Sequence, residues 1–192
     1  MQKVILLVLT DQWADWEAAY AIAGTNEEPE FIVKTVAVDL APKVSIGGLR
    51  TEIDYRIEDF RDFDNVVLII LPGGYSWSEN QYPEIAAFVR EAKTLDIPVA
   101  AICGATLFLG KHGILDNIRH TGDTFEFFEN MQGYKGHEYY VPAQIVVDKG
   151  FITANETAAV DFAYNIFKIL KIDTDEEIEL WYDKFKNGMV RR

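Results

Sequence analysis

The stretch that decides the fold is an apolar run ending in the only cysteine of the chain, Pro98-Val99-Ala100-Ala101-Ile102-Cys103-Gly104-Ala105. It predicts a buried strand over 98–102 that turns at Cys103 into a helix over 105–112. Small residues two positions before and after the cysteine fit the sharp strand-to-helix turn called a nucleophile elbow, which places the thiol at a helix N-terminus. Unpaired N–H groups there favour the reactive thiolate. The alternative for this segment alone is a buried structural cysteine.

Apolar, β-branched runs alternate with segments of helical period through most of the chain. We expect strands over 4–9, 31–38, 66–71 and 98–102, and helices over 16–24, 82–95 and 105–112. Strands that alternate with crossover helices predict an α/β fold, a three-layer α/β/α sandwich around a mainly parallel sheet. In such sheets the chemistry lies beyond the carboxyl ends of the strands.

The remaining segments predict smaller elements. Asp15 is available as the N-cap of the first helix, and Ile46-Gly47-Gly48-Leu49 indicates a short hairpin within 44–55. Later elements are expected to be a short strand at 118–121, a short helix at 124–131, a hairpin of 144–147 with 151–154, a helix at 157–170 and an extra C-terminal helix at about 173–187. We expect one domain spanning residues 1–192.

Composition excludes several classes of function. Lys and Arg number 18 against 31 Asp and Glu, which gives a net charge of −13. Such a surface repels phosphate backbones and anionic lipids, so we expect neither a nucleic-acid nor a membrane partner. No signal peptide and no run of about 18 apolar residues is present, which predicts a cytoplasmic protein. We expect no metal and no cofactor, because zinc-site spacings and Gly-rich phosphate loops are missing from the sequence.

The elbow alone does not activate its thiol strongly. A helix N-terminus lowers the pKa of a thiol by about one unit from about 8.5. The net charge of −13 works against a thiolate, although salt screens distant charges. A strongly activated Cys103 therefore needs a nearby hydrogen-bond donor or cation.

Several segments together resemble the ThiJ/PfpI family of the class I glutamine amidotransferase-like superfamily. They are the elbow followed by Gly113-Ile114-Leu115-Asp116, the strand end Leu71-Pro72-Gly73-Gly74, and Phe151-Ile152-Thr153-Ala154 ahead of Ala158-Ala159-Val160-Asp161-Phe162-Ala163. The resemblance runs to about Leu170. It implies a flavodoxin-like sandwich, a homodimer, and an elbow cysteine as the reactive residue.

The resemblance also implies roles for individual residues. Cys103 matches the family nucleophile, and Glu17 matches an acidic residue that stays protonated and donates a hydrogen bond to the thiolate. The alternative for Glu17 is an exposed glutamate in the first turn of a helix. Gly73 or Gly74 matches a glycine whose N–H forms an oxyanion pocket with that of Gly104, the alternative being an ordinary turn. Of the two, we favour Gly74.

One departure concerns histidine. Many relatives place one directly after the cysteine, where this chain has Gly104, or in a later short strand, where it has Asp123. A hydrolase needs a general base near its thiol. The candidates by elimination are Asp123, His120 and His137.

Three functions are compatible with these residues. The favoured one is a cysteine-dependent hydrolase or a glyoxalase/deglycase-like enzyme that acts on a small molecule with a carbonyl or amide group. Trp13, Trp16 and Trp77 follow strand ends and could wall its pocket, with core packing or a dimer contact as alternatives. The other functions are a redox-responsive stress protein whose Cys103 is reversibly oxidised, and a binding protein without catalysis.

Overall fold

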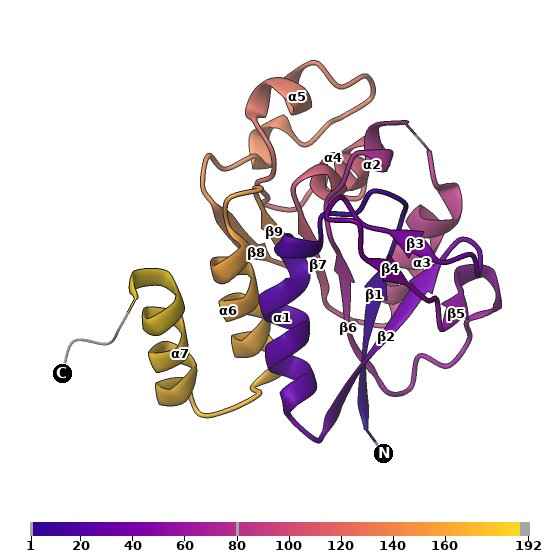
Figure 1. The fold of residues 1–192 in the computed structure, drawn as a ribbon. Coiled ribbons are helices and arrows are strands. Elements are labelled where there is room, and N and C mark those ends of the chain that lie inside the picture. The colour runs from indigo at the N-terminus through magenta and orange to yellow at the C-terminus, as the bar shows by residue number, and fades with distance from the viewer. Residues whose placement is uncertain (1, 80, 189–192) are drawn as a thin grey trace.

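A seven-stranded sheet forms the middle layer of the protein, and the computed structural model describes residues 2–79 and 81–188. Residues 1, 80 and 189–192 belong to the predicted domain but lie outside the described residues. The strands follow the order β5-β2-β1-β6-β7-β9-β8 (Figure 1). Their bounds are β1 Lys3–Val8, β2 Phe31–Ala37, β5 Tyr55–Arg56, β6 Val66–Leu71, β7 Val99–Ile102, β8 Ile145–Asp148 and β9 Phe151–Ala154. Neighbouring strands are parallel except β8, which runs antiparallel to β9.

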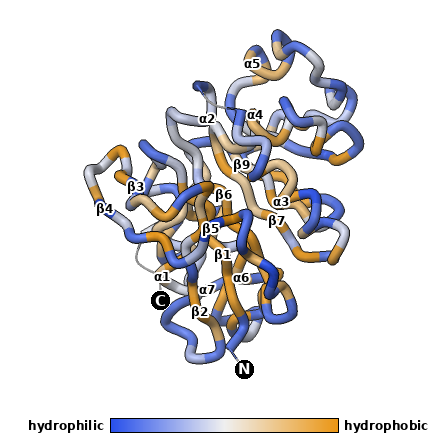
Figure 2. The backbone as a smooth tube through the Cα atoms, turned by 90° about the vertical axis from the view of Figure 1, so that its right-hand side faces the viewer, coloured by the Kyte–Doolittle hydropathy of each residue, from blue (hydrophilic) through white to orange (hydrophobic). Residues whose placement is uncertain are grey.

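The central strands are apolar on both faces because both faces are covered. Along β1, Leu6 and Val8 point into one core, whereas Ile5 and Leu7 point into the other. Hydrophobic segments accordingly gather in the inner strands, and hydrophilic segments follow the outer loops (Figure 2). The predicted three-layer sandwich is confirmed.

Helices cover the sheet on both sides (Figure 1). One core holds side chains of α1 (Asp15–Glu27), α6 (Ala159–Leu170) and α7 (Asp175–Asn187). The other holds side chains of α2 (Ser76–Glu79), α3 (Pro83–Thr94), α4 (Gly104–Lys111) and α5 (Phe125–Glu129). Two short 3₁₀ turns, η1 (Ile57–Asp59) and η2 (His137–Tyr139), complete the helical elements of the described residues. Among these residues, no helix is long and apolar enough to cross a bilayer.

The predicted hairpin within 44–55 is present as β3 (Lys43–Val44) paired with β4 (Arg50–Thr51). Its turn packs against the start of α1, where the Ser45 hydroxyl donates to Asp15 Oδ2 at 2.5 Å. Asp15 is therefore not the N-cap. The helix begins at Asp15, and Ala14 takes the cap position without a side-chain hydrogen bond.

The predicted strand at 118–121 is wrong. Only one parallel bridge, between His120 and Tyr140, forms there. The neighbouring Thr121 N–H donates to the Thr153 side chain at 3.0 Å rather than to a strand backbone. Backbone pairing therefore ends after the single bridge at His120, although the apolar pattern of the segment resembles that of a strand.

Candidate active site

The thiol lies in a strained turn between β7 and α4. Cys103 has φ 55° and ψ −129°, a conformation that non-glycine residues rarely adopt. Two backbone hydrogen bonds hold it: its N–H donates to Ala154 O, and its carbonyl accepts from the Thr106 N–H, each at 2.9 Å. A Cβ at Gly104 would lie 3.0 Å from Gly74 O, so the loop after β6 passes directly over the elbow.

Glu17 reaches the thiol from the first turn of α1. The loop after β1 pairs with the loop after β6, where the Ala14 N–H donates to Gly73 O at 2.9 Å. The Gly73 N–H in turn donates to Glu17 Oε2 at 2.6 Å. A Cβ at Gly73 would lie 2.5 Å from Glu17 Oε2 and 3.1 Å from Cys103 Sγ, which shows how tightly the three residues meet.

The Glu17 carboxyl is buried, with 1% of the residue exposed. Burial raises its pKa to about 7, although the hydrogen bonds from Gly73 and Cys103 oppose the shift. Within the described chain, Oε1 has no hydrogen-bond partner of standard geometry. The carboxyl can therefore gain or lose a proton near neutral pH. The alternative of an exposed first-turn glutamate is wrong.

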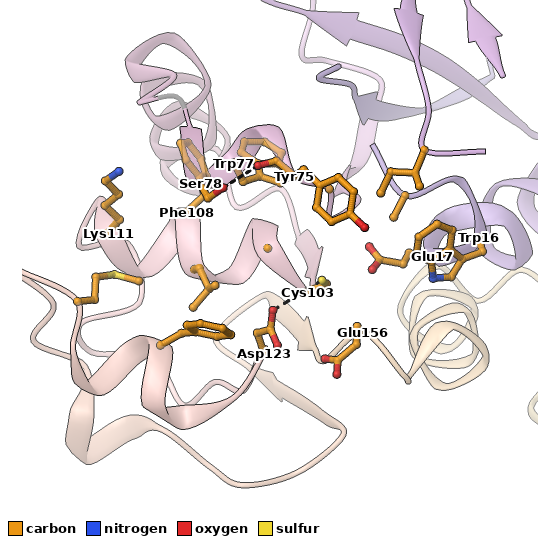
Figure 3. Close-up of a pocket in the computed structure, with 17 residues that line it drawn as sticks. Trp16, Glu17, Tyr75, Trp77, Ser78, Cys103, Phe108, Lys111, Asp123 and Glu156 are labelled. Carbon is orange, nitrogen blue, oxygen red and sulfur yellow. Dashed lines mark hydrogen bonds between the residues drawn. The ribbon is translucent and has the colours of Figure 1, made fainter. Parts of the chain in front are cut away.

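The pKa of the Cys103 thiol is raised, not lowered. Burial is the main cause, and the negative charge of Glu17 adds to it, while the Gly104 N–H opposes both. The helix N-terminus thus acts in the expected direction but is outweighed. Lys111 is the one cation among the described residues that line the site, and it lies at the end away from the sulfur (Figure 3). The thiol needs a base to remove its proton, and Glu17 lies against it.

Two more carboxyls complete the acidic end of the site. The Cys103 thiol donates to Asp123 Oδ2 at 3.9 Å, a long contact. The pKa of Asp123 is raised by burial, and the charge of Glu156 adds to the shift. Glu156 was not predicted. Its position two residues after the end of β9, the strand beside β7, was the signal that could have identified it.

The histidine candidates do not reach the site. His120 is fully buried, with Nδ1 2.6 Å from Ile118 O and Nε2 2.5 Å from the Tyr134 hydroxyl. Burial lowers the pKa of this imidazole, which favours the neutral ring. Both ring nitrogens are occupied by these two contacts, so the role of His120 is structural. His137 is exposed in η2 and packs on the Tyr134 ring with centroids 4.7 Å apart. Neither histidine lines the cavity around Cys103, so neither is placed to act as its general base.

The thiol opens into a cavity of about 710 Å³ between the ends of β1, β6 and β7 (Figure 3). Its carboxyls lie near the sulfur, and Lys111 lies at the opposite end. Of the three tryptophans that follow strand ends, Trp16 and Trp77 line the cavity, and Trp77 also packs in one core, whereas Trp13 packs in the other core. The remaining lining is mainly apolar: Ala14, Ile46, Leu107, Phe108, Phe127 and Met131.

The two predicted oxyanion donors both line this cavity. The Gly73 N–H is bound to Glu17, which leaves Gly74 as the glycine of the β6 loop that faces the cavity. Gly104 follows the cysteine at the first position of α4. Among the described residues, no group of three or more His, Cys, Asp or Glu side chains could hold a metal ion.

The chain is similar to known proteins over almost its whole length. Residues 2–169 match the DJ-1/PfpI family. A Bacillus subtilis protein called uncharacterized protease YdeA is 41% identical, and the match covers 93% of this chain and 88% of that protein. The B. subtilis uncharacterized protease YoaZ is 32% identical, and the match covers 94% of this chain and 89% of that protein. The crystal structure of a thiJ/pfpI family protein from Bacillus anthracis has a TM-score of 0.89 at 31% identity, with 98% of this chain and 92% of that chain covered.

Proposed function

Because the chain belongs to the DJ-1/PfpI family, we propose that it is a cysteine-dependent enzyme that acts on a carbonyl or amide group through Cys103 and Glu17. The observation that carries the proposal is the contact between a neutral, half-buried thiol and a carboxyl whose pKa is raised to about 7. A general base works best when its pKa is near the working pH.

In the proposed first step, the ionised Glu17 takes the S–H proton while the sulfur attacks the carbonyl carbon. An S–C bond forms, and the C=O double bond becomes a C–O single bond. The oxygen carries negative charge until Glu17 returns the proton to it. The N–H groups of Gly74 and Gly104 would stabilise that oxygen, because both residues line the cavity at the elbow.

Glyoxalase-type chemistry suits this site better than peptide hydrolysis. A peptide bond needs a proton on its leaving nitrogen, which histidine usually supplies in cysteine proteases. The three histidines of the described chain do not line the cavity. In the conversion of a 2-oxoaldehyde to a 2-hydroxy acid, Glu17 would move a proton from the sulfur-bearing carbon to the neighbouring carbonyl carbon through an enediol, which leaves a thioester on Cys103. Water then adds to the thioester carbon, the S–C bond breaks, and the sulfur leaves as a thiolate that takes back a proton. Peptide hydrolysis is the second candidate, because two similar proteins are named as uncharacterized proteases.

The redox alternative has less support. Oxidation begins with the thiolate, whose population falls when the pKa of the thiol is raised. A sulfinate would also add negative charge beside Glu17, Asp123 and Glu156.

The test is lactate formation from methylglyoxal by the purified protein, with unfolded casein as the peptide substrate. We expect lactate formation that is lost in Cys103→Ala and reduced at least about 100-fold in Glu17→Gln, as for removal of a general base. Glu91→Gln on the exposed face of α3 is the matched control. Turnover that survives Cys103→Ala would overturn the proposal, and casein cleavage without lactate formation would favour the hydrolase.

A further inference from the structure

A second cavity lies next to the first one, although Cys103 itself is not among its lining residues. It measures about 350 Å³ and shares Asp123 and Glu156 with the first cavity. Its other lining residues are polar or small: Gly122, Thr124, Tyr140, Pro142, Ala143, Gln144 and Asn155. The two carboxyls therefore stand at the boundary between an apolar chamber and a polar chamber.

The charge at this boundary is of one sign. Glu156 is exposed on its loop, and Asp123 lies 3.9 Å from the sulfur. Neither Lys, Arg nor His is among the described residues that line the smaller cavity. Glu17 adds a further observation, because its Oε1 is buried and lacks a hydrogen-bond partner of standard geometry within the described chain, and its side chain points into the site (Figure 3).

The large cavity is lined mainly by apolar and aromatic side chains. Aromatic side chains stand at its mouth with large exposed fractions: Trp16 48%, Tyr75 62% and Phe127 57%. They come from three separate elements, namely α1, the loop after β6, and α5. A molecule held there would cover apolar surface that water now contacts.

We propose that the substrate of Cys103 carries, beyond its reactive carbonyl group, both a protonated amine and an apolar group. The ammonium lies between Asp123 and Glu156, at the boundary of the two cavities. The apolar group fills the large cavity, and the carbonyl carbon lies over the sulfur. Anionic carbonyl compounds are excluded by repulsion from the same carboxyls.

This inference rests on the proposed function for the kind of group that reacts, but its charge preference can be measured without turnover. Alkyl methanethiosulfonates convert a thiol into a mixed disulfide and release methanesulfinate. The probes are the 2-aminoethyl (cationic), ethyl (neutral) and 2-sulfonatoethyl (anionic) reagents. The labelling rate of Cys103 is followed by intact mass at pH 7 and divided by the rate of N-acetylcysteine with the same reagent.

We expect the normalised cation-to-anion rate ratio to exceed ten, because carboxylates within several ångströms of the sulfur act through a medium of reduced dielectric. Glu156→Gln should lower the ratio about fivefold, and Asp123→Asn by a similar factor. Glu91→Gln removes the same charge from a distant exposed position and should leave the ratio unchanged. This control separates the local carboxyls from the net charge of −13.

The apolar part of the proposal is tested with benzyl and methyl methanethiosulfonates. The benzyl reagent should gain at least about fivefold over the methyl reagent, and Phe127→Ser should reduce that gain. A cation-to-anion ratio that Glu156→Gln and Glu91→Gln change equally would overturn the proposed amine site. Loss of methylglyoxal turnover with the charge preference intact would instead overturn only the proposed function.

Discussion

At Cys103, burial and neighbouring charge outweigh the helix N-terminus. The Gly104 N–H lowers the pKa of the thiol, but burial and the Glu17 carboxylate raise this pKa by a larger amount. The thiol and the carboxyl titrate as a coupled pair, because the charge of one changes the proton affinity of the other. The elbow therefore positions the sulfur, and Glu17 controls its proton.

Replacing Glu17 with Gln should lower the pKa of the Cys103 thiol. The amide keeps a donor next to the sulfur and removes a negative charge that now raises this pKa. The measurement is the rate of iodoacetamide alkylation against pH, followed by intact mass. The half-point of the variant should lie at lower pH than that of the wild type. A higher half-point would mean that Glu17 donates its proton to a thiolate in the native protein.

The pH dependence of catalysis should follow the ionisation of Glu17. Only the carboxylate can take the thiol proton, and its pKa is about 7. The value of kcat/KM for methylglyoxal should therefore rise between pH 6 and 8, with a half-point at about 7. A profile that is flat or falls over this range would contradict the assignment of Glu17 as the base.

At the scale of the elements, the site depends on the close approach of three chain segments. The loops after β1 and β6 pair through Trp13 and Gly74, and the elbow after β7 lies below them. Gly73 occupies the point where these segments meet, because no side chain fits between Glu17 and Cys103.

Gly73→Ala should displace the Glu17 carboxyl and reduce turnover at least about tenfold, with a loss of about 1–3 kcal/mol in unfolding free energy. Gly24→Ala is a matched control. Its Cβ would meet Phe167 Cζ at 2.4 Å between α1 and α6, far from the thiol. Both variants should lose stability in urea denaturation, but only Gly73→Ala should change the pH profile of alkylation. Equal profiles in the two variants would show that the glycine matters for packing alone.

The C-terminal helix α7 packs on α6, away from the cavity (Figure 1). Asp161 on α6 accepts hydrogen bonds from Tyr182 at 2.8 Å and Lys186 at 2.6 Å. Ile178 is the buried apolar anchor, with 2% exposed. Ile178→Ala should cost about 2–4 kcal/mol of unfolding free energy and leave methylglyoxal turnover within about twofold. A large loss of turnover in a still-folded variant would link α7 to the site.

For the whole molecule, the raised pKa of Glu17 makes stability depend on pH. The folded state holds this proton more tightly, with a pKa of about 7 against 4.5 for the free carboxyl. The stabilisation is fully present below about pH 4.5 and is lost as pH rises through about 7.

Glu17→Gln should therefore gain stability relative to the wild type on going from pH 5 to pH 8. The difference should reach about 2 kcal/mol, because the stabilisation falls by up to about 1.4 kcal/mol per pH unit between the two pKa values. Chemical denaturation of both proteins at the two pH values measures it. A stability difference independent of pH would show that the Glu17 carboxyl is ionised in the folded protein throughout this range.

The sequence predicted the order of strands and helices well, because continuous apolar runs and helical periods are local properties. It failed at 118–121, where one β-bridge and the side chain of Thr153 replace a ladder. It also assigned Asp15 wrongly as the N-cap of α1, whereas Asp15 is the first helical residue and accepts a hydrogen bond from Ser45 in the hairpin turn. In each case the deciding partner is distant in the chain.

The sequence by itself determined the sandwich, the elbow at Cys103 and the strand ends at which side chains gather. The tertiary structure decided which of those side chains meet. It brought Glu17, Asp123 and Glu156 around the sulfur, bound His120 to Tyr134 in the core, and raised the pKa of both the thiol and Glu17. Protonation depends on burial and on charges that act through space, and neither quantity is encoded in the spacing of residues along the chain.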